Sequence, residues 1–288
     1  MKETLWQRLV RGGRRVRQRP EWERFAGVDW PERIMTVPAT DRFHAKQGRS
    51  TGRWIVQAHG ARLAVYLKRH YHLPRWRGLL AALWPRANWS PALQEWRHLE
   101  WAQAQGMPVP AAMAACEYIG PWGKLQSFLA VQELTGMLAL HEAIPAAAAR
   151  LKDEVFQRWK RGLLAEVVRL VRALHERCYF HKDLYLCHFF ILQEDLGQVP
   201  TTWRGRVHLI DLHRLGYHPW TRPLWQAKDL GQLLYSSEIV GLEARDRLRF
   251  WRCYLGSGRR TRAATWLRRH ILLKWWSYRR HNRKKRLR

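Results

Sequence analysis

Residues 179–192, with the sequence YFHKDLYLCHFFIL, constrain the fold of this chain more than any other segment. A charged core, His181-Lys182-Asp183, lies between apolar flanks, and His188 follows Asp183 at a spacing of five. The segment comes directly after apolar residues that recur at three- and four-residue steps over 163–174, which predicts a long amphipathic helix. An aspartate on a loop with apolar flanks suits a group that must be held still while a substrate hydroxyl approaches.

The first half of the chain has the pattern of antiparallel strands. Three short apolar stretches lie around 43, 54–56 and 63–67, with turns expected at 48–52 and 59–60. Ser90-Pro91 is typical of a helix start, and this helix should end near Gly106. Two more strands are expected, at 111–118 and 126–132.

The second half is helical, apart from two short extended pieces at 189–192 and 207–210. The order predicts an α+β fold with a strand-rich N-lobe and a helical C-lobe. Four segments are expected: a basic leader at 1–36, an N-lobe with the nucleotide-binding sheet and helix at 37–135, a C-lobe with the catalytic and metal loops at 136–258, and a basic, aromatic C-terminal helix and tail at 259–288.

The charge of the chain restricts its partners. A net charge of +29 and a pI of about 11.2 indicate a polyanionic partner. Nucleic acid, an anionic membrane surface, a phosphorylated or carboxylated substrate and an acidic protein all satisfy this condition. No apolar run approaches the length of a membrane span, and the basic first 20 residues lack the apolar region of a secretory signal.

Several motifs together resemble those of protein kinases. The pattern H-x-D-L-x-x-x-H at 181–188 resembles the kinase catalytic loop H-R-D-L-x-x-x-N. Asp211, in VHLIDLHRL, ends an apolar strand at the place of the kinase metal-binding aspartate. LAVYLKRH resembles the V-A-I-K strand and places Lys68 on the third strand, where Glu95 of the next helix is its expected partner and Glu100 the alternative.

Each of these residues alone has a simpler interpretation. Glu95 fits a helix surface, Asp211 fits a strand cap, and KQGRSTGRW, which lacks the full G-x-G-x-x-G, fits a plain hairpin turn at Gly48 and Gly52. Their order along the chain nevertheless predicts a protein-kinase-like two-lobe fold.

HKDLYLCHFFIL followed by LIDLHRL is similar to the bacterial lipopolysaccharide kinase family, whose members phosphorylate heptose or Kdo of the inner core. That family resembles this chain in having histidine where protein kinases have asparagine, and Asp-Leu-His in place of Asp-Phe-Gly. The similarity extends over about 43–234, and KDLGQLLYS resembles the downstream R-D-L element.

The resemblance implies a role for each matching residue in the C-lobe. Asp183 would orient the sugar hydroxyl or accept its proton, and His181 would mainly orient the loop. Asp211 would bind magnesium on the phosphates, and Asp229 would brace the catalytic loop. His188 remains open: it would hold a single metal ion, allow manganese, or hydrogen-bond to phosphate.

The implied cofactors are ATP and Mg²⁺, with Mn²⁺ as the alternative ion. The nucleotide is assigned to five residues: Lys68 and Glu95 for the α and β phosphates, with Gly48, Gly52 and Glu133.

The short stretch between Asp211 and Asp229 bears on the substrate. It has no Ala-Pro-Glu element, and its hydroxyl-bearing residues are Tyr217 and Thr221. Protein kinases use a longer segment here as a peptide platform and a phosphorylation switch. The sequence therefore predicts a constitutively active kinase of a small molecule or glycolipid.

The expected partners are the anionic lipopolysaccharide core and the anionic inner-membrane surface, at which a cytoplasmic, peripherally bound enzyme would work. The basic, aromatic residues 268–288 suit docking there, and a packed helix with a solvated tail is the alternative. An acidic protein partner also fits the charge.

Competing functions are a kinase of another small molecule or of a protein, a pseudokinase scaffold, and a basic nucleic-acid- or membrane-binding protein. Nucleic acid explains the charge but gives Asp183 and Asp211 no role, so it is not the expected partner.

Overall fold

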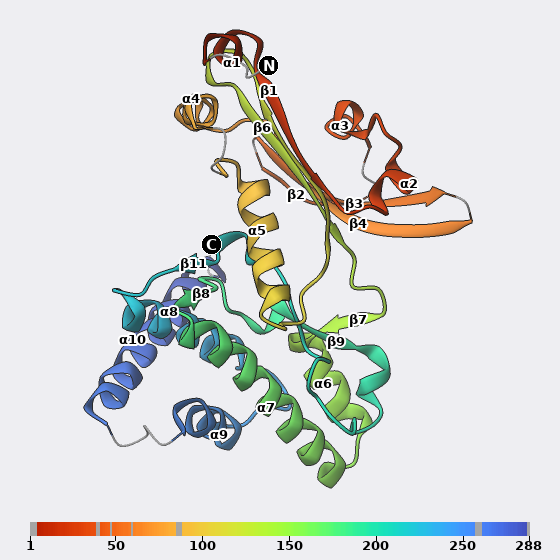
Figure 1. Cartoon of the computed structure of the whole chain (residues 1–288). Coiled ribbons are helices and arrows are strands. Elements are labelled where there is room, and N and C mark those ends of the chain that lie inside the picture. The colour runs from red at the N-terminus through yellow and green to blue at the C-terminus, as the bar shows by residue number, and fades with distance from the viewer. Residues whose placement is uncertain are drawn as a thin grey trace. The chain divides into compact units, whose positions relative to one another are not determined.

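A computed structural model describes residues 5–38, 41–46, 48–58, 60–84, 88–256 and 261–286 (Figure 1). The chain forms two compact units. The N-terminal unit comprises residues 1–105 and 109–135, and the C-terminal unit comprises residues 106–108 and 136–288. Residues 106–108 belong to the second unit, where the backbone N–H of Leu209 donates to the carbonyl of Pro108 at 2.8 Å.

A six-stranded antiparallel sheet with the order β1-β5-β6-β4-β3-β2 forms the N-terminal unit. Its strands are β1 Gly13–Gln18, β2 Asp41–Lys46, β3 Arg49–Ala58, β4 Ala61–His70, β5 Ala112–Ile119 and β6 Leu125–Gln132. The expected meander corresponds to β2, β3 and β4. The first turn is shorter than predicted, because Gly52 lies inside β3 opposite Leu67 rather than in the loop.

Residues 5–36, the described part of the expected basic leader at 1–36, contribute to the core of this unit. They form helix α1 Leu5–Arg11, strand β1 and the short helices α2 Trp22–Ala26 and α3 Trp30–Arg33. Strand β1 pairs with β5 from Gly13↔Ile119 to Gln18↔Ala114. Trp22 and Trp30 are fully or almost fully buried, and the Trp30 ring centroid lies 5.3 Å from that of Phe128 on β6.

Two further helices complete the N-terminal unit, α4 Arg75–Leu83 and α5 Pro91–Ala104. The hydroxyl of Ser90 caps α5 by accepting from the backbone N–H of Leu93, as the Ser-Pro pair predicts. Leu93 and Leu99 on the buried face of α5 are almost inaccessible to solvent, and the helix packs against β4, β5 and β6. The position of α5 therefore fixes Glu95 relative to β4.

The C-terminal unit is mainly helical, as predicted, with α6 Leu140–Arg150, α7 Asp153–Glu176, α8 Arg222–Ser236, α9 Ala244–Leu255 and α10 Arg262–Arg286. Two small antiparallel sheets support its loops. One has the order β10-β9-β7, and the other pairs β11 with β8; their strands are β7 Met137–Ala139, β8 Tyr179–Phe180, β9 Phe189–Leu192, β10 His208–Leu209 and β11 Gly216–Tyr217.

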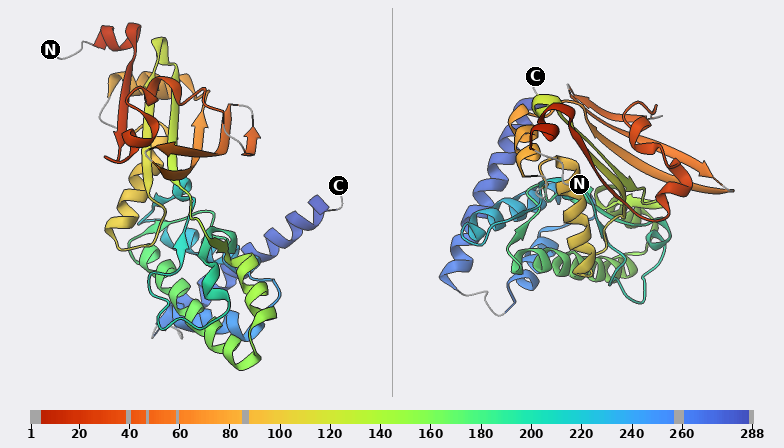
Figure 2. Two further views of the ribbon diagram at one scale, coloured as in Figure 1. Left: turned by 90° about the vertical axis from the view of Figure 1, so that its right-hand side faces the viewer. Right: turned by 45° about the horizontal axis from the view of Figure 1, so that its top comes forward.

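Helix α10 lies against α8 (Figure 2). Gly231 allows this close contact, because a Cβ at this position would lie 2.7 Å from Cβ of Lys274 on α10. Across the described ranges, no helix is both long enough and apolar enough to span a bilayer. The predicted α+β class, with a strand-rich first unit and a mainly helical second unit, is confirmed.

Candidate functional site

The expected catalytic loop follows α7 directly and is shaped by two left-handed residues. Cys178 has a φ of 59° and Lys182 has a φ of 66°, values that residues other than glycine rarely adopt. Strand β8 precedes the loop and pairs with β11, with Phe180 opposite Gly216. Such backbone strain persists only where the surroundings hold it, and the contacts of Asp229 do so.

Asp229 lies on α8 and is fully buried beneath the loop. Its carboxylate accepts from the backbone N–H groups of His181 and Lys182, both at 2.8 Å. His175, at the end of α7, places Nε2 3.3 Å from the same carboxylate and Nδ1 2.8 Å from the hydroxyl oxygen of Tyr254. These contacts tie α7, α8 and the loop together at one buried carboxylate.

Gln232 is a second support for the loop that the sequence analysis missed. It lies three residues after Asp229 on the same face of α8, and its Oε1 accepts from the backbone N–H of Leu184 at 3.1 Å. Its Nε2 lies 3.3 Å from the carbonyl of Lys182 and 3.4 Å from Oδ1 of Asp183. The helical spacing of Asp229 and Gln232 in KDLGQLL was the available signal.

His181 connects the loop to the strand that leads to Asp211. Its side chain is fully buried, and Nε2 donates to the carbonyl of Ile210 at 3.0 Å. Burial lowers the pKa of His181 below its ordinary value. The imidazole is therefore neutral at neutral pH, in keeping with a positioning role.

Asp183 presents a partly exposed carboxylate next to these supports. Its Oδ2 pairs with Arg214 Nη1 at 3.1 Å, and its side chain is 25% exposed. Arg214 belongs to the segment after Asp211 and was not among the predicted site residues. The interaction places a guanidinium on the oxygen that a substrate hydroxyl would approach.

Asp211 and His188 lie next to each other in the same unit. Oδ2 of Asp211 is 3.9 Å from Nε2 of His188, and Oδ1 of Asp211 is 2.8 Å from Nδ1 of His213. His188 Nδ1 is 2.6 Å from the carbonyl of Asp183. Because a carbonyl accepts only, Nδ1 of neutral His188 carries the proton, and Nε2 keeps its lone pair.

As metal ligands, Asp211 and His188 are compatible with a divalent ion that also binds a nucleotide. Within the described ranges, no three histidine, cysteine, aspartate or glutamate side chains are gathered into a ready-made metal cage. Magnesium does not require such a cage, since one or two carboxylates plus phosphate oxygens and water usually suffice. Asp211 supplies an oxygen donor, and the free Nε2 of His188 is a ligand better suited to manganese.

Lys68 and Glu95 form an ion pair in the N-terminal unit. Lys68 lies on β4, the third strand of the expected meander, and its Nζ is 2.7 Å from Oε1 of Glu95 on α5. The Glu95 side chain is only 4% exposed, whereas Glu100, the alternative partner, is exposed on the same helix. The observed pair is therefore the one that the motif order favoured.

The remaining nucleotide candidates, Gly48, Gly52 and Glu133, lie in the same unit as Lys68. Gly48 has a φ of 85° in the turn between β2 and β3, and Gly52 lies within β3. Glu133 follows β6, and its carboxylate binds the Arg53 guanidinium at 2.9–3.0 Å. The carboxylate of Glu133 is therefore already paired with Arg53.

Each unit therefore holds its own part of the candidate site. The C-terminal unit brings together His181, Asp183, His188, Asp211 and Asp229. The N-terminal unit joins Lys68 to Glu95.

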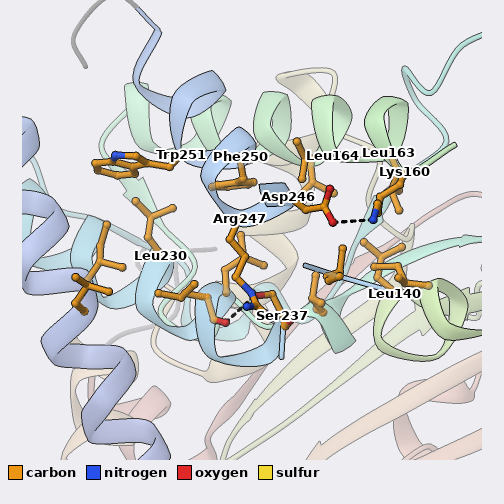
Figure 3. Close-up of a pocket in the computed structure, with 18 of the residues that line it drawn as sticks. Leu140, Lys160, Leu163, Leu164, Leu230, Ser237, Asp246, Arg247, Phe250 and Trp251 are labelled. Carbon is orange, nitrogen blue, oxygen red and sulfur yellow. Dashed lines mark hydrogen bonds and ion pairs between the residues drawn. The ribbon is translucent and has the colours of Figure 1, made fainter. Parts of the chain in front are cut away.

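A separate apolar cavity of about 220 Å³ lies within the C-terminal unit (Figure 3). Residues of five helices line it, including Leu140, Leu163, Leu230, Phe250 and Ile271. Lys160 and Asp246, both 2% exposed, form a 2.7 Å ion pair at its wall, and Lys160 also donates to the carbonyl of Gly241 at 2.9 Å. With these charges paired, the cavity presents a mainly hydrocarbon surface.

Comparison with known proteins places the chain among bacterial lipopolysaccharide kinases. It is 32% identical over 163 residues to the lipopolysaccharide core heptose(I) kinase WaaP of Pseudomonas aeruginosa, an alignment covering 57% of this chain and 59% of that protein. It is 34% identical over 133 residues to WaaP of Escherichia coli K12, covering 45% of this chain and 47% of that protein. The matches thus span about half the length of these relatives.

A solved structure titled "WaaP in complex with acyl carrier protein" superposes with a TM-score of 0.65 at 25% identity, covering 91% of this chain and 99% of that one. The model of the lipopolysaccharide kinase (Kdo/WaaP) family matches residues 39–254. This match covers most of the chain and includes every predicted site residue, and the chain belongs to the lipopolysaccharide kinase (Kdo/WaaP) family.

Proposed function

We propose that this protein is an ATP-dependent kinase that transfers the γ-phosphate to a sugar hydroxyl of the lipopolysaccharide inner core, with heptose the first candidate acceptor and Kdo the second. The observation that carries the proposal is the bracing of the Asp183 loop. Asp229 binds two successive N–H groups of the loop, and His181 ties the loop to the strand before Asp211.

In the proposed reaction, Asp183 orients the acceptor hydroxyl and accepts its proton as the oxygen bonds to the γ-phosphorus, while the bond from that phosphorus to the β–γ bridging oxygen breaks and ADP leaves. Arg214 must first release Oδ2 of Asp183. Asp211 and His188 would hold the divalent ion, which neutralises phosphate charge when bound. Lys68, positioned by Glu95, would contact the α and β phosphates.

The short segment after Asp211 supports a sugar acceptor over a peptide. A 3₁₀ turn at Leu212–Arg214 and strand β11 take up five of the ten residues between Asp211 and α8, which begins at Arg222. Few residues remain for the extended platform on which protein kinases bind peptides. The pairing of β11 with β8 also holds this segment without phosphorylation.

A test is the transfer of radiolabelled phosphate from ATP to three acceptors: a dephosphorylated heptose core oligosaccharide, a Kdo-terminated core and a generic protein. The proposal expects label on the heptose core, less on the Kdo core and none on protein. Efficient labelling of the protein, with none on either sugar, contradicts it.

We propose that the enzyme works at the cytoplasmic face of the inner membrane, with α10 as its contact. Leu273 and Trp276 on this helix are 62% and 55% exposed, whereas Ile271 is buried. Arg280 lies over the Trp276 ring at 5.4 Å, and basic residues near an anionic surface contribute about 1 kcal/mol each. Flotation with anionic and neutral vesicles tests this: Trp276→Ser should reduce binding to anionic vesicles, and equal binding of both proteins contradicts the contact.

An acidic carrier protein is a further proposed partner. The similar solved structure is a complex with acyl carrier protein, and the net charge of +29 on this chain suits an acidic surface. The apolar cavity would accommodate the carrier's acyl chain. Leu234→Trp, which fills the cavity, should weaken binding of acylated carrier more than of unacylated carrier in a pull-down, and equal effects on both forms refute this use of the cavity.

A further inference from the structure

Two lysines lie over one aromatic ring close to Asp183, and a third cation, Arg214, is near both of them. Lys182 Nζ lies 4.9 Å from the Trp225 ring centroid, and Lys228 Nζ lies 5.2 Å from the same centroid. Arg214 is the third cation, and it binds Asp183. Among the described residues, neither Lys182 nor Lys228 forms an ion pair, so the cluster carries excess positive charge.

The cations lie close enough to destabilise one another. Burial lowers the pKa of Lys182, and the charges of Lys228 and Arg214 lower it further. Burial and Arg214 likewise lower the pKa of Lys228, to which Lys274 of α10 adds a smaller effect. The charge of Asp229 raises the pKa of both lysines, but its carboxylate is already hydrogen-bonded to the loop amides. An anion in this cluster would relieve the repulsion.

The absence of a side chain at Gly216 lets two polar nitrogens approach the backbone beside the cluster. A Cβ on Gly216 would lie 2.3 Å from Lys182 Nζ and 2.9 Å from His218 Nε2, so both nitrogens converge on this glycine. His218 stacks on Trp225 with ring centroids 4.6 Å apart. In the described part of the chain, its Nε2 is buried without a hydrogen-bond partner. A buried polar atom without a partner is costly unless a ligand satisfies it.

We propose that Lys182, Arg214 and Lys228 form an acceptor-recognition site that binds an anionic group, a carboxylate or a phosphate, carried near the hydroxyl to be phosphorylated. The inference rests on the proposed kinase function and adds an acidic group to the acceptor's required chemistry. Arg214 has two alternative partners in this arrangement. It pairs with Asp183 when the acceptor is absent and with the acceptor anion when it is present, which frees the carboxylate for the hydroxyl.

The test compares acceptors that differ only in their acidic groups. The core oligosaccharide is used in three forms: with its carboxylates and no phosphate, with its carboxylates reduced to alcohols and phosphate retained, and with neither. Acceptor affinity is measured by calorimetry without nucleotide, and KM and kcat are measured in the transfer assay. Wild-type protein should bind one acid-bearing form at least tenfold more tightly than the acid-free form, and the form that does so identifies the anion.

Lys228→Gln and Gly216→Ala perturb the site without altering Asp183. Lys228→Gln should raise the dissociation constant and KM of the acid-bearing acceptor about tenfold, with the loss in KM rather than in kcat, and should leave the acid-free acceptor unaffected. Gly216→Ala should have the same selective effect, because its methyl group would displace the Lys182 ammonium. Lys152→Gln removes the same charge from an exposed position and is the matched control.

Equal wild-type affinity for all three acceptors overturns the proposal, as does a Lys228→Gln protein that behaves like the Lys152→Gln control. A rise in KM for ATP instead would assign the cluster to the nucleotide. If no acceptor is phosphorylated, the proposed function fails, while calorimetry still decides whether the anion site exists.

Discussion

Replacing the buried carboxylate of Asp229 with an amide should loosen the catalytic loop without changing the shape of the side chain. Asp229→Asn keeps one acceptor oxygen and replaces the other with an NH₂ group. That group would face the backbone N–H of His181 or of Lys182, each now 2.8 Å from a carboxylate oxygen. One buried donor then has no acceptor, and the other loses the charge of its acceptor.

The size of the effect follows from these two bonds. A hydrogen bond to a charged group contributes about 1.5–3 kcal/mol, and a buried donor without a partner costs about 1–3 kcal/mol. Local opening of the loop should therefore become easier by about 2–4 kcal/mol. This corresponds to amide exchange that is faster by about 30- to 700-fold where exchange proceeds through local opening.

Hydrogen exchange read by mass spectrometry over residues 178–186 measures this directly. It avoids a global unfolding curve, which two units need not give in a single step. As the control, Glu194→Gln removes a carboxylate charge at a 65% exposed side chain and should change the free energy of loop opening by less than about 0.5 kcal/mol, so exchange over 178–186 should stay close to that of the wild type. Unchanged exchange at the loop in Asp229→Asn would refute the bracing role.

Three further predictions follow from the contacts of single residues. Asp183→Asn should abolish phosphate transfer but keep nucleotide affinity within about twofold, measured with a fluorescent ATP analogue, and retained transfer contradicts its role. Lys68→Ala should weaken that affinity about tenfold, because it removes the ammonium that Glu95 holds in place; unchanged affinity would remove Lys68 from the nucleotide site. Burial lowers the pKa of His181 in the folded chain. Below a pH of about 6.5, the unfolded chain therefore binds a proton at this imidazole more readily than the folded chain does. Below this pH, the free energy of unfolding should decrease as the pH is lowered, by up to about 1.4 kcal/mol per pH unit for this proton. His181→Gln should flatten this dependence in acid denaturation. An unchanged slope in the variant would show that His181 does not contribute.

Local patterns were sufficient to predict most of the fold. The meander, the Ser-Pro helix start and the apolar steps over 163–174 each depend on side-chain spacing within one element, and the structure has an element at each place. Strand β1 was not predicted because its sequence, GRRVRQ, has a single apolar residue. The strand forms by pairing with β5. No alternating pattern marks a strand whose stabilisation comes from a distant partner.

The site residues were predicted less evenly. The pairing of Lys68 with Glu95 followed from motif order, although α4, which the sequence did not predict, lies between β4 and α5 along the chain. The position of Arg214 on Asp183 and the support from Gln232 depend on how α8 and the segment after Asp211 fold back onto the loop. Contacts between such distant segments leave no periodic signal in one sequence.

The central claim is that Asp183 directs phosphate from ATP onto a sugar hydroxyl. Its most direct test is mass spectrometry of a dephosphorylated heptose core oligosaccharide after incubation with ATP, Mg²⁺ and either wild-type protein or Asp183→Asn. The account predicts a gain of one phosphoryl group, mapped by fragmentation to heptose, with the wild type and none with the variant. A wild-type product without phosphate on any sugar, or equal phosphorylation by the variant, would contradict it.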